Sequence, residues 1–317
     1  MPALTGIEEK YFNGYKVDKE NDSVVYSDEQ HVYLDKEDCQ KYISVTSLIH
    51  LYSNEFDANF WSAYKALEAI LEEVDWLSIK PTLLAKKKFN PEILKRMNID
   101  EEVFNLKQKE ILAEYDRKRE ESCIRGTAIH SQFEESFYGK SKFDFKRFGF
   151  DEVSDCDFTC KKDYYKLDLP RGVYPEFLIS CKSDDGLLRL SGQIDFLCID
   201  GTDVYICDWK TNREIKKSGY FDKMKKQKQT LKYPLNDLDD CNFNIYQLQL
   251  STYAYMLQIL RPELNIKKLM IYHIDHDGNE TMHECKYLKK EVIRMLNHYK
   301  KQVKVQQQLD KNKPIKM

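Results

Sequence analysis

The most informative stretch of this sequence reads Ser191-Gly-Gln-Ile-Asp-Phe-Leu-Cys-Ile-Asp-Gly-Thr-Asp-Val-Tyr-Ile-Cys-Asp-Trp-Lys-Thr-Asn212. It holds two apolar runs joined by the polar turn Asp200-Gly-Thr202, a pattern typical of an antiparallel β-hairpin. Asp195 interrupts the first run, and Asp208 and Lys210 end the second. Residues two apart in a strand share a face, so Asp208 and Lys210 point the same way, and strand pairing can bring Asp195 next to Asp208.

These charged residues suit the metal-dependent hydrolysis of a phosphodiester. Charges inside apolar strands are costly unless they are paired or bound to a metal. Two neighbouring carboxylates repel each other, and a hard divalent cation such as Mg²⁺ removes that repulsion. The reaction needs an activated water, a Lewis acid on the phosphate and stabilisation of the developing charge, to which an adjacent lysine contributes. Asp195 and Asp208 are therefore candidate metal ligands, and Lys210 is a candidate catalytic residue.

The elements around the hairpin predict an α/β fold. A helix precedes three β-rich runs, and a strongly apolar helix and further strands follow them. Consecutive strands pair antiparallel and the strand after the long helix can join the sheet, so we expect a mixed sheet flanked by helices. The expected elements are helix 125–138, strands 173–182, 187–199 and 203–209, helix 245–260, strands 267–275 and 280–287, and helix 289–308.

The beginning of the chain differs in character from this core. We expect a short β-hairpin region at 24–34 and 42–50, followed by helices at 55–73 and 100–121. This N-terminal region is mainly helical and could shape a channel for a substrate. The expected division is an N-terminal region at 1–119, a catalytic core at 120–309 and a C-terminal tail at 310–317.

The composition is that of a globular protein with a real core. Of its residues, 42% are hydrophobic and 13% aromatic, which argues against disorder. The net charge of −3 leaves no global basic field, so any binding of nucleic acid must come from local patches. The nine cysteines contain no C-x-x-C pair and lie mostly in apolar runs, which indicates free thiols in a reducing compartment.

No targeting segment is visible in this sequence. No apolar run approaches the roughly 18 residues needed to span a bilayer. We therefore expect a soluble, intracellular protein that does not act at a membrane. It would be cytoplasmic, or nuclear in a eukaryote or a virus.

Further motifs occur in a fixed order around the hairpin. They are Ser44-Val-Thr46, Gly126-Thr-Ala-Ile-His130, Glu176 ahead of Gly192-Gln-Ile-Asp195, then Asp208-Trp-Lys210 and Gln249-Leu-Ser-Thr-Tyr253. In this order they resemble the PD-(D/E)XK nuclease superfamily, and more narrowly its RecB-like branch of λ-type, CRISPR-associated and mitochondrial genome maintenance exonucleases. Asp-x-Lys alone is a weak signal, whereas the ordered series is specific.

The resemblance implies a restriction-endonuclease-like core and a role for each motif residue. It makes Glu176, Asp195, Asp208 and Lys210 the catalytic residues. His130, Asp195 and Asp208 would hold the metal, Glu176 would act through a water, and Lys210 would position the nucleophile. The expected metal is Mg²⁺ or Mn²⁺, and the imidazole of His130 suits Mn²⁺ better than Mg²⁺.

Each of these residues also has a simpler interpretation. His130 could be a satisfied histidine on a helix face, and Glu176 could be a solvated glutamate at a strand start. Gln249 and Tyr253 lie one turn apart and could belong to an amphipathic core helix, rather than brace the active site and touch the DNA backbone. The two aspartates could be strand-edge turn residues.

A lysine-rich stretch is the candidate DNA-binding segment. Residues 216–232 hold seven lysines and one acid, interleaved with aromatic side chains, which suits contact with a single strand. A solvated loop is an equally good interpretation. Arg125 is expected to contact phosphate near the amino end of its helix. The other residues expected to bind DNA or support the active site are Thr211, Asn212, Lys223, Lys225, Lys226 and Lys228.

The expected function is that of a metal-dependent DNA exonuclease in recombination, repair or replication, with partners among the proteins of those processes. A structure-specific or restriction-like endonuclease and a non-catalytic DNA-binding module are the alternatives, and RNA cleavage and the oligomeric state stay open. Only Cys285 follows Tyr253, so no iron–sulfur cluster is expected. Gly139-Lys-Ser141 lacks the upstream glycine of a P-loop, so no nucleotide cofactor is expected.

Overall fold

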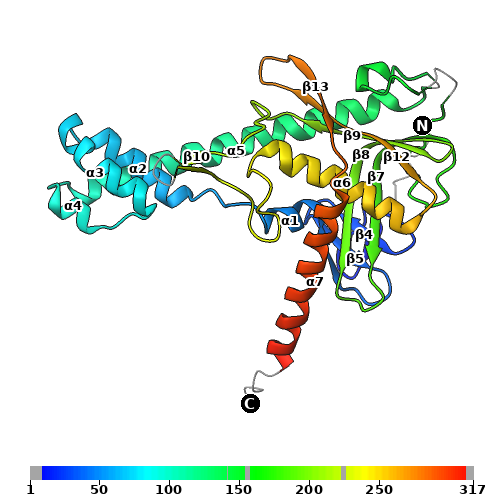
Figure 1. Cartoon of the computed structure of the whole chain (residues 1–317), viewed down its shortest axis with the longest axis horizontal. Helices are drawn as coiled ribbons and strands as arrows, with labels where there is room; N and C mark the ends of the chain where they lie inside the picture. The colour runs from blue at the N-terminus through cyan, green and yellow to red at the C-terminus, as the bar shows by residue number, and fades with distance from the viewer. Residues whose placement is uncertain (1–8, 141, 154–157, 223–225, 312–317) are drawn as a thin grey trace, which may run out of the picture. The chain divides into compact units, whose positions relative to one another are not determined.

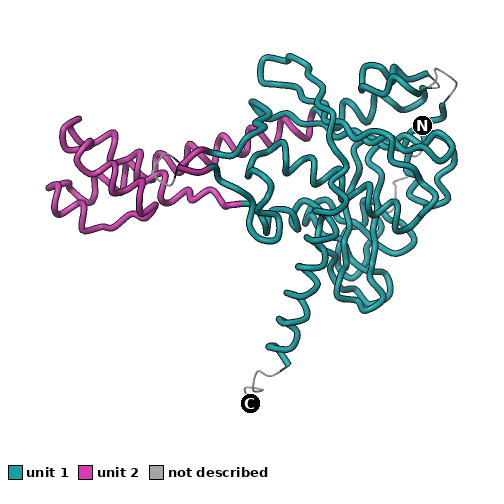
Figure 2. Tube along the Cα trace, in the orientation of Figure 1, with its two compact units in different colours: residues 1–53, 129–220, 228–317 teal, residues 54–128, 221–227 magenta. Residues whose placement is uncertain are grey.

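The structure is a computed structural model that describes residues 9–140, 142–153, 158–222 and 226–311 (Figure 1). The chain forms two compact units (Figure 2). The first comprises residues 1–53, 129–220 and 228–317, and the second comprises residues 54–128 and 221–227. Residues 1–53, which the sequence groups with an N-terminal region, therefore lie in the same unit as the central sheet.

Within the described residues, the first unit is built on a nine-stranded sheet. Its strands run in the order β13-β12-β9-β8-β6-β5-β4-β3, and β7 also pairs with β8. The bounds are β3 Lys19–Glu20, β4 Val24–Ser27, β5 Val32–Asp35, β6 Lys41–Ser44, β7 Gly172–Lys182, β8 Arg189–Asp200, β9 Asp203–Lys210, β12 Asn265–Ile274 and β13 Glu280–Cys285. Two short pairs stand apart from it, β1 Tyr11–Phe12 with β2 Tyr15–Lys16, and β10 Phe221–Asp222 with β11 Gln227–Lys228.

The sheet is mixed, as the sequence predicts. β8 pairs antiparallel with β7 and β9, whereas β9 pairs parallel with β12, and β6 pairs parallel with β8. Helix α6 (Asn242–Leu260) lies between β9 and β12 in the chain, which provides the long connection that a parallel pair requires. The α/β class with a mixed sheet flanked by helices is thus confirmed.

Strand alternation divides the core between the two faces of the sheet. Leu197 and Ile199 of β8 pack in the cluster that contains α1 (Val45–His50), α6 and α7 (Lys289–Lys311). Phe196 and Cys198 face the other way, into an aromatic cluster with the end of α5 (Glu101–Phe137) and the 3₁₀ turn η1 (Lys146–Phe148). The period of two in the apolar runs therefore produces two separately packed layers.

Two local predictions were wrong. Helices 100–121 and 125–138 are one continuous helix, α5, because Gly126 alone costs a helix only about 1 kcal/mol and no proline interrupts it. Residues 45–50, expected in a β-hairpin region, form helix α1 after β6. Ser44 caps this helix by accepting a 3.0 Å hydrogen bond from the backbone N–H of Ser47, which ends the strand. The hairpin of β4 and β5 is present.

The second unit is helical. It contains α2 (Ala58–Ile70), α3 (Glu73–Lys86), α4 (Glu92–Arg96) and the first part of α5. Asp57 caps α2 through a hydrogen bond from the backbone N–H of Phe60. The buried side chains of Phe60, Trp76 and Phe104 give the unit its own core. Among the described helices of the whole chain, none has the length and apolar character that crossing a membrane requires.

Candidate active site

Strands β8 and β9 separate at the position of the two aspartates. Their pairing runs from Asp200 opposite Asp203 to Phe196 opposite Cys207, and the next residues are Asp195 and Asp208. Beyond this point β8 pairs with β6 instead, at Leu190 and Ser191. The backbone N–H of Trp209 donates a 2.8 Å hydrogen bond to Oδ2 of Asp195, so a side chain replaces the ladder where the strands part. The hairpin therefore opens at its charged residues.

Three potential ligand side chains meet beside this opening. His130 of α5, Glu176 of β7 and Asp195 of β8 offer ligand atoms that all lie within 4.8 Å of one another. Nδ1 of His130 is 3.6 Å from Oε1 of Glu176 and 3.6 Å from Oδ2 of Asp195. Glu176 reaches Asp195 because β7 and β8 are in register on both sides of these residues, with Pro175 opposite Phe196.

The backbone of Glu176 has an unusual conformation for the interior of a strand. Its φ is +49°, in the left-handed region that non-glycine residues rarely adopt. Such a conformation costs on the order of 1–3 kcal/mol and persists only where the surroundings impose it. The side chain it presents is 15% exposed and points to His130. Strain at this residue is therefore associated with the carboxylate cluster.

The backbone of Trp209 orients two of the three side chains. Nε2 of His130 lies 3.2 Å from the carbonyl oxygen of Trp209, which can only accept, so Nε2 carries a proton. Nδ1 of His130 then faces the carboxylates, and the backbone N–H of Trp209 donates its hydrogen bond to Asp195. Burial opposes the charged imidazole, but Asp195 and Glu176 outweigh it and raise the pKa of His130 to about 9. Before a cation binds, His130 is thus the positive partner of the acids.

Asp208 and Lys210 form a second group with Gln249 of α6. Nζ of Lys210 lies 2.5 Å from Oδ2 of Asp208 and donates a 3.3 Å hydrogen bond to Oε1 of Gln249. The amide Nε2 of Gln249 donates a 3.0 Å hydrogen bond to Oδ1 of Asp208. The ammonium also lies 4.7 Å from the centre of the Tyr246 ring, a cation–π distance. Three side chains therefore contact the ammonium of Lys210 at the end of β9.

Burial controls the charge of both aspartates. It raises the pKa of Asp208 to about 6, with Lys210 opposing the rise and Asp195 adding to it. It also raises the pKa of Asp195, where His130 opposes the rise and Glu176 adds to it. Each carboxylate is thus destabilised by desolvation and by the other acids, which is the condition that a bound cation relieves.

The donor set fits a hard or borderline divalent cation. One imidazole nitrogen and two carboxylate oxygens converge in a partly buried place, and oxygen-rich ligands of this kind suit Mg²⁺ and Mn²⁺. The expected ligand set was His130, Asp195 and Asp208, with Glu176 acting through a water. In the described residues, Glu176 joins His130 and Asp195 at ligand distance, whereas Asp208 contacts Lys210 and Gln249.

Tyr253 supports the site by packing. Its side chain is 3% exposed and belongs to the core cluster to which β8 and α6 both contribute residues. A Cβ atom at Gly192 would lie 2.8 Å from Cε1 and 2.9 Å from the hydroxyl oxygen of Tyr253, closer than real contacts allow. The glycine of the Gly-x-x-Asp motif is therefore needed for the close approach of this ring to β8.

The remaining candidates lie in different surroundings. Arg125 lies inside α5, so the prediction that it stands near the amino end of a helix is wrong, and its contact with phosphate stays a prediction. Thr211 and Asn212 follow β9, and the carbonyl of Asn212 accepts a 2.6 Å hydrogen bond from Nε2 of His273.

In the lysine-rich stretch, Lys226 is exposed, and Lys228 is exposed and lies 3.3 Å from Asp239. Lys223 and Lys225 lie outside the described residues.

Three residues of the site were not found from the sequence. Lys19 of β3 donates a 2.7 Å hydrogen bond to Oε1 of Gln193, and its Nζ lies 3.8 Å from Oε2 of Glu176. Gln193 could have been found, because it is two residues before Asp195 and so shares its face. Tyr246 could also have been found, because it is three residues before Gln249 on the same helix. No local signal marks Lys19.

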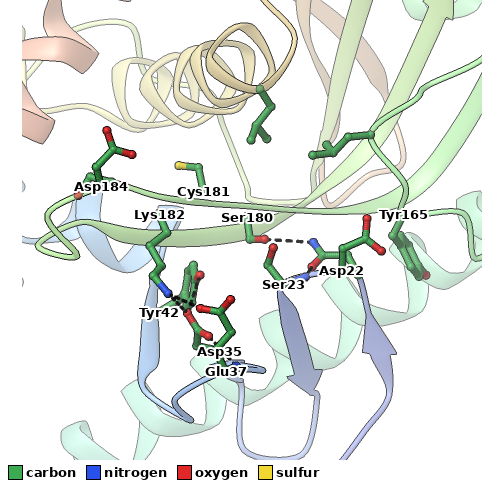
Figure 3. Close-up of a pocket in the computed structure, with 14 residues that line it drawn as sticks. Asp22, Ser23, Asp35, Glu37, Tyr42, Tyr165, Ser180, Cys181, Lys182 and Asp184 are labelled. Carbon is green, nitrogen blue, oxygen red and sulfur yellow. Dashed lines mark hydrogen bonds and ion pairs between the residues drawn. The ribbon is translucent and has the colours of Figure 1, made fainter.

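A separate pocket in the same unit has no part in this arrangement. It has a volume of about 430 Å³, and its walls include Asp35, Tyr42 and Lys182 (Figure 3). The buried carboxylate of Asp35 accepts hydrogen bonds from Tyr42, Lys182 and Arg189. These contacts satisfy the carboxylate within the protein, so the acid has a structural explanation.

Comparison with known proteins adds no assignment. No protein-family model matches this chain, and no curated protein is similar enough to count as a match.

Proposed function

We propose that this chain is a metal-dependent nuclease that hydrolyses phosphodiester bonds of DNA. The observation that carries the proposal is the convergence of residues that are far apart in the sequence. His130, Glu176, Asp195, Asp208, Lys210 and Gln249 come from five elements and meet where β8 and β9 separate. A group of acids with one imidazole and one lysine, in which both aspartates are buried, is unfavourable for stability alone, which favours a catalytic role.

In this proposal the side chains of the site have separate roles in holding the metal and orienting its ligands. His130, Glu176 and Asp195 hold the divalent cation, with Asp208 completing the acidic surface beside them. The bound cation supplies an activated water and a Lewis acid for the phosphate. The backbone of Trp209 keeps His130 and Asp195 oriented, in the manner of partners that align metal ligands.

We assign to Lys210 the role of positioning the nucleophilic water. Asp208 and Gln249 hold its ammonium from two sides, so its position does not depend on bound substrate. A fixed positive charge beside the carboxylates can orient a water and stabilise the charge that develops on the phosphate. The function of Gln249 is then to position both Lys210 and Asp208.

The finer assignments rest on the motif resemblance. We propose a restriction-endonuclease-like core of the RecB-like branch and, within it, a DNA exonuclease of recombination, repair or replication. The mixed order of the sheet around β8 and β9 supports such a core. An endonuclease is the rival within the same class, and a non-catalytic DNA-binding module is the rival from another class.

One assay separates these functions. The chain is incubated with closed circular plasmid and with end-labelled linear DNA, each with Mg²⁺ and with chelator. Loss of label from ends with intact circles indicates an exonuclease, and nicked circles indicate an endonuclease. Binding without cleavage of either substrate would contradict the proposal. Asp195→Asn is the inactive comparison, and Asp200→Asn is its matched control, because Asp200 lies on the same strand but pairs with Arg171.

A further inference from the structure

The side chain of Lys19 lies beside the metal-ligand cluster without belonging to any motif. It comes from the short strand β3 and is 21% exposed, and its Nζ is 3.8 Å from Oε2 of Glu176. We propose that Lys19 is a substrate-contacting residue whose ammonium binds a phosphate oxygen of the strand being cut. This inference rests on the proposed nuclease function and adds a residue from outside the recognised motifs.

Gln193 directs Lys19 toward the site. It accepts the 2.7 Å hydrogen bond from Nζ of Lys19 and stands two residues before Asp195 in β8. Residues at this spacing share a face of the strand, so Gln193 holds Lys19 over the surface that carries Asp195.

Glu176 is shared between two cationic side chains. Its Oε1 faces Nδ1 of His130 at 3.6 Å, and its Oε2 faces Nζ of Lys19 at 3.8 Å. A divalent cation held by Glu176 would neutralise this carboxylate and would repel the lysine ammonium at the same time. Among the described residues, Lys19 has no second carboxylate within ion-pair distance. A phosphate of the substrate would then be an anion that can replace Glu176 as the partner of Lys19.

The contrast with Lys210 supports separate roles for the two lysines. Lys210 lies 2.5 Å from Asp208 and is also held by Gln249, so most of its donors are engaged within the protein. Lys19 has a longer contact with its carboxylate and one neutral acceptor in Gln193. An ammonium acts toward phosphate as a compact point charge, so a lysine with a loosely bound partner can turn to the substrate.

The test compares three variants of the full chain. Lys19→Met removes the charge and keeps the length, and Lys19→Arg keeps the charge. Lys36→Met is the matched control, because Lys36 pairs with Glu20 of the same strand and donates to the carbonyl of Asn21. Cleavage of linear DNA is measured at saturating Mg²⁺, and Mn²⁺ binding is measured by calorimetry in the absence of DNA.

We expect Lys19→Met to lower kcat/KM by about 10- to 100-fold, the range for a lost hydrogen bond to a charged group. The same variant should bind Mn²⁺ as tightly as the wild-type protein or more tightly, because a positive charge near Glu176 has been removed. Lys19→Arg should keep most of the activity, and Lys36→Met should change neither quantity. Loss of cleavage with unimpaired metal binding is a combination that a merely structural role would not produce.

Two results would overturn the inference while leaving the nuclease proposal intact. One is cleavage by Lys19→Met at the wild-type rate. The other is a parallel loss of Mn²⁺ binding and cleavage in Lys19→Met and Lys36→Met, which would indicate a structural role. Absence of cleavage by the wild-type chain would instead remove the proposed function, and the inference with it.

Discussion

The carbonyl oxygen of Trp209 lies 3.2 Å from Nε2 of His130, while the N–H of the same residue donates to Asp195. The backbone of this one residue therefore orients two proposed metal ligands that come from different elements. The indole of Trp209 is buried in the aromatic cluster on the other face of the sheet, stacked on Phe133 at 4.6 Å between ring centres. Packing of the Trp209 indole in this cluster thus helps to position the backbone that binds His130 and Asp195.

Asp208→Asn should abolish cleavage and leave the fold intact. The variant loses the negative charge that holds Lys210, and it also loses the repulsion between Asp208 and Asp195. These effects oppose each other, so we expect the free energy of unfolding to change by about 1 kcal/mol or less. Cleavage rate and thermal unfolding are measured together. Cleavage near the wild-type rate would show that the active site has been assigned wrongly.

Cleavage should depend on the identity of the divalent cation. We expect activity to vanish with chelator and to return with Mg²⁺ or Mn²⁺, whereas Ca²⁺ should permit DNA binding without turnover. Ca²⁺ tolerates longer and looser coordination and activates water poorly. End-labelled DNA is used for cleavage, and a filter or gel assay for binding. Full activity in excess chelator would contradict the mechanism.

The affinity for Mn²⁺ should rise with pH. Without a cation, burial opposes the charged imidazole, but Asp195 and Glu176 raise the pKa of His130 to about 9, so Nδ1 is protonated at neutral pH. Nδ1 must lose this proton to bind the cation, and binding therefore releases a proton below about pH 9. Calorimetry in buffers of different ionisation enthalpy measures the release. His130→Gln should bind more weakly and release fewer protons. An equal release from both proteins would exclude His130 as a ligand.

Gly192→Ala should destabilise the protein through a clash with Tyr253. The added Cβ would lie 2.8 Å from the ring, and overpacking of this kind costs about 1–3 kcal/mol. The double variant Gly192→Ala/Tyr253→Leu should show a smaller combined loss than the sum of the single variants, because the ring is no longer there. Denaturant unfolding provides both values. If the two losses of unfolding free energy simply add, residues 192 and 253 do not clash.

Neutralising Lys223, Lys225, Lys226 and Lys228 together should weaken DNA binding and flatten its salt dependence. Each lost phosphate contact removes roughly one released counterion. Cleavage of already bound substrate should change little, because none of these residues is proposed to contact the metal. Neutralising Lys289, Lys290, Lys301 and Lys304 of α7 is the matched control for total charge. An unchanged slope in the first variant would identify the stretch as a solvated loop.

Local patterns were sufficient for the hairpin and its faces. The turn at Asp200–Thr202 and the two-residue period predict the pairing of β8 and β9, and this pairing is observed up to Phe196 and Cys207. The one-turn spacing of Gln249 and Tyr253 likewise predicts a shared face of one helix. These features involve residues that are close in sequence, where strand and helix periods fix the geometry.

Helix ends were less predictable for a physical reason. The start expected at 125 does not exist, because a single glycine weakens a helix by too little to end it and no proline interrupts α5. The end of β6 depends on a hydrogen bond from the backbone N–H of Ser47 to the side-chain hydroxyl oxygen of Ser44, a small local preference that competes with strand pairing. Such boundaries are decided by small differences in free energy.

The sequence by itself determined the class of the fold, the hairpin and the alternation that sends Asp208 and Trp209 to opposite faces. Only the tertiary structure decided that Glu176 lies against His130 and that Lys19 reaches Glu176 from β3. The reason is that these contacts join distant parts of the chain. They depend on the register of β7 against β8 and on the point where β8 leaves β9 for β6, and no local periodicity encodes either one.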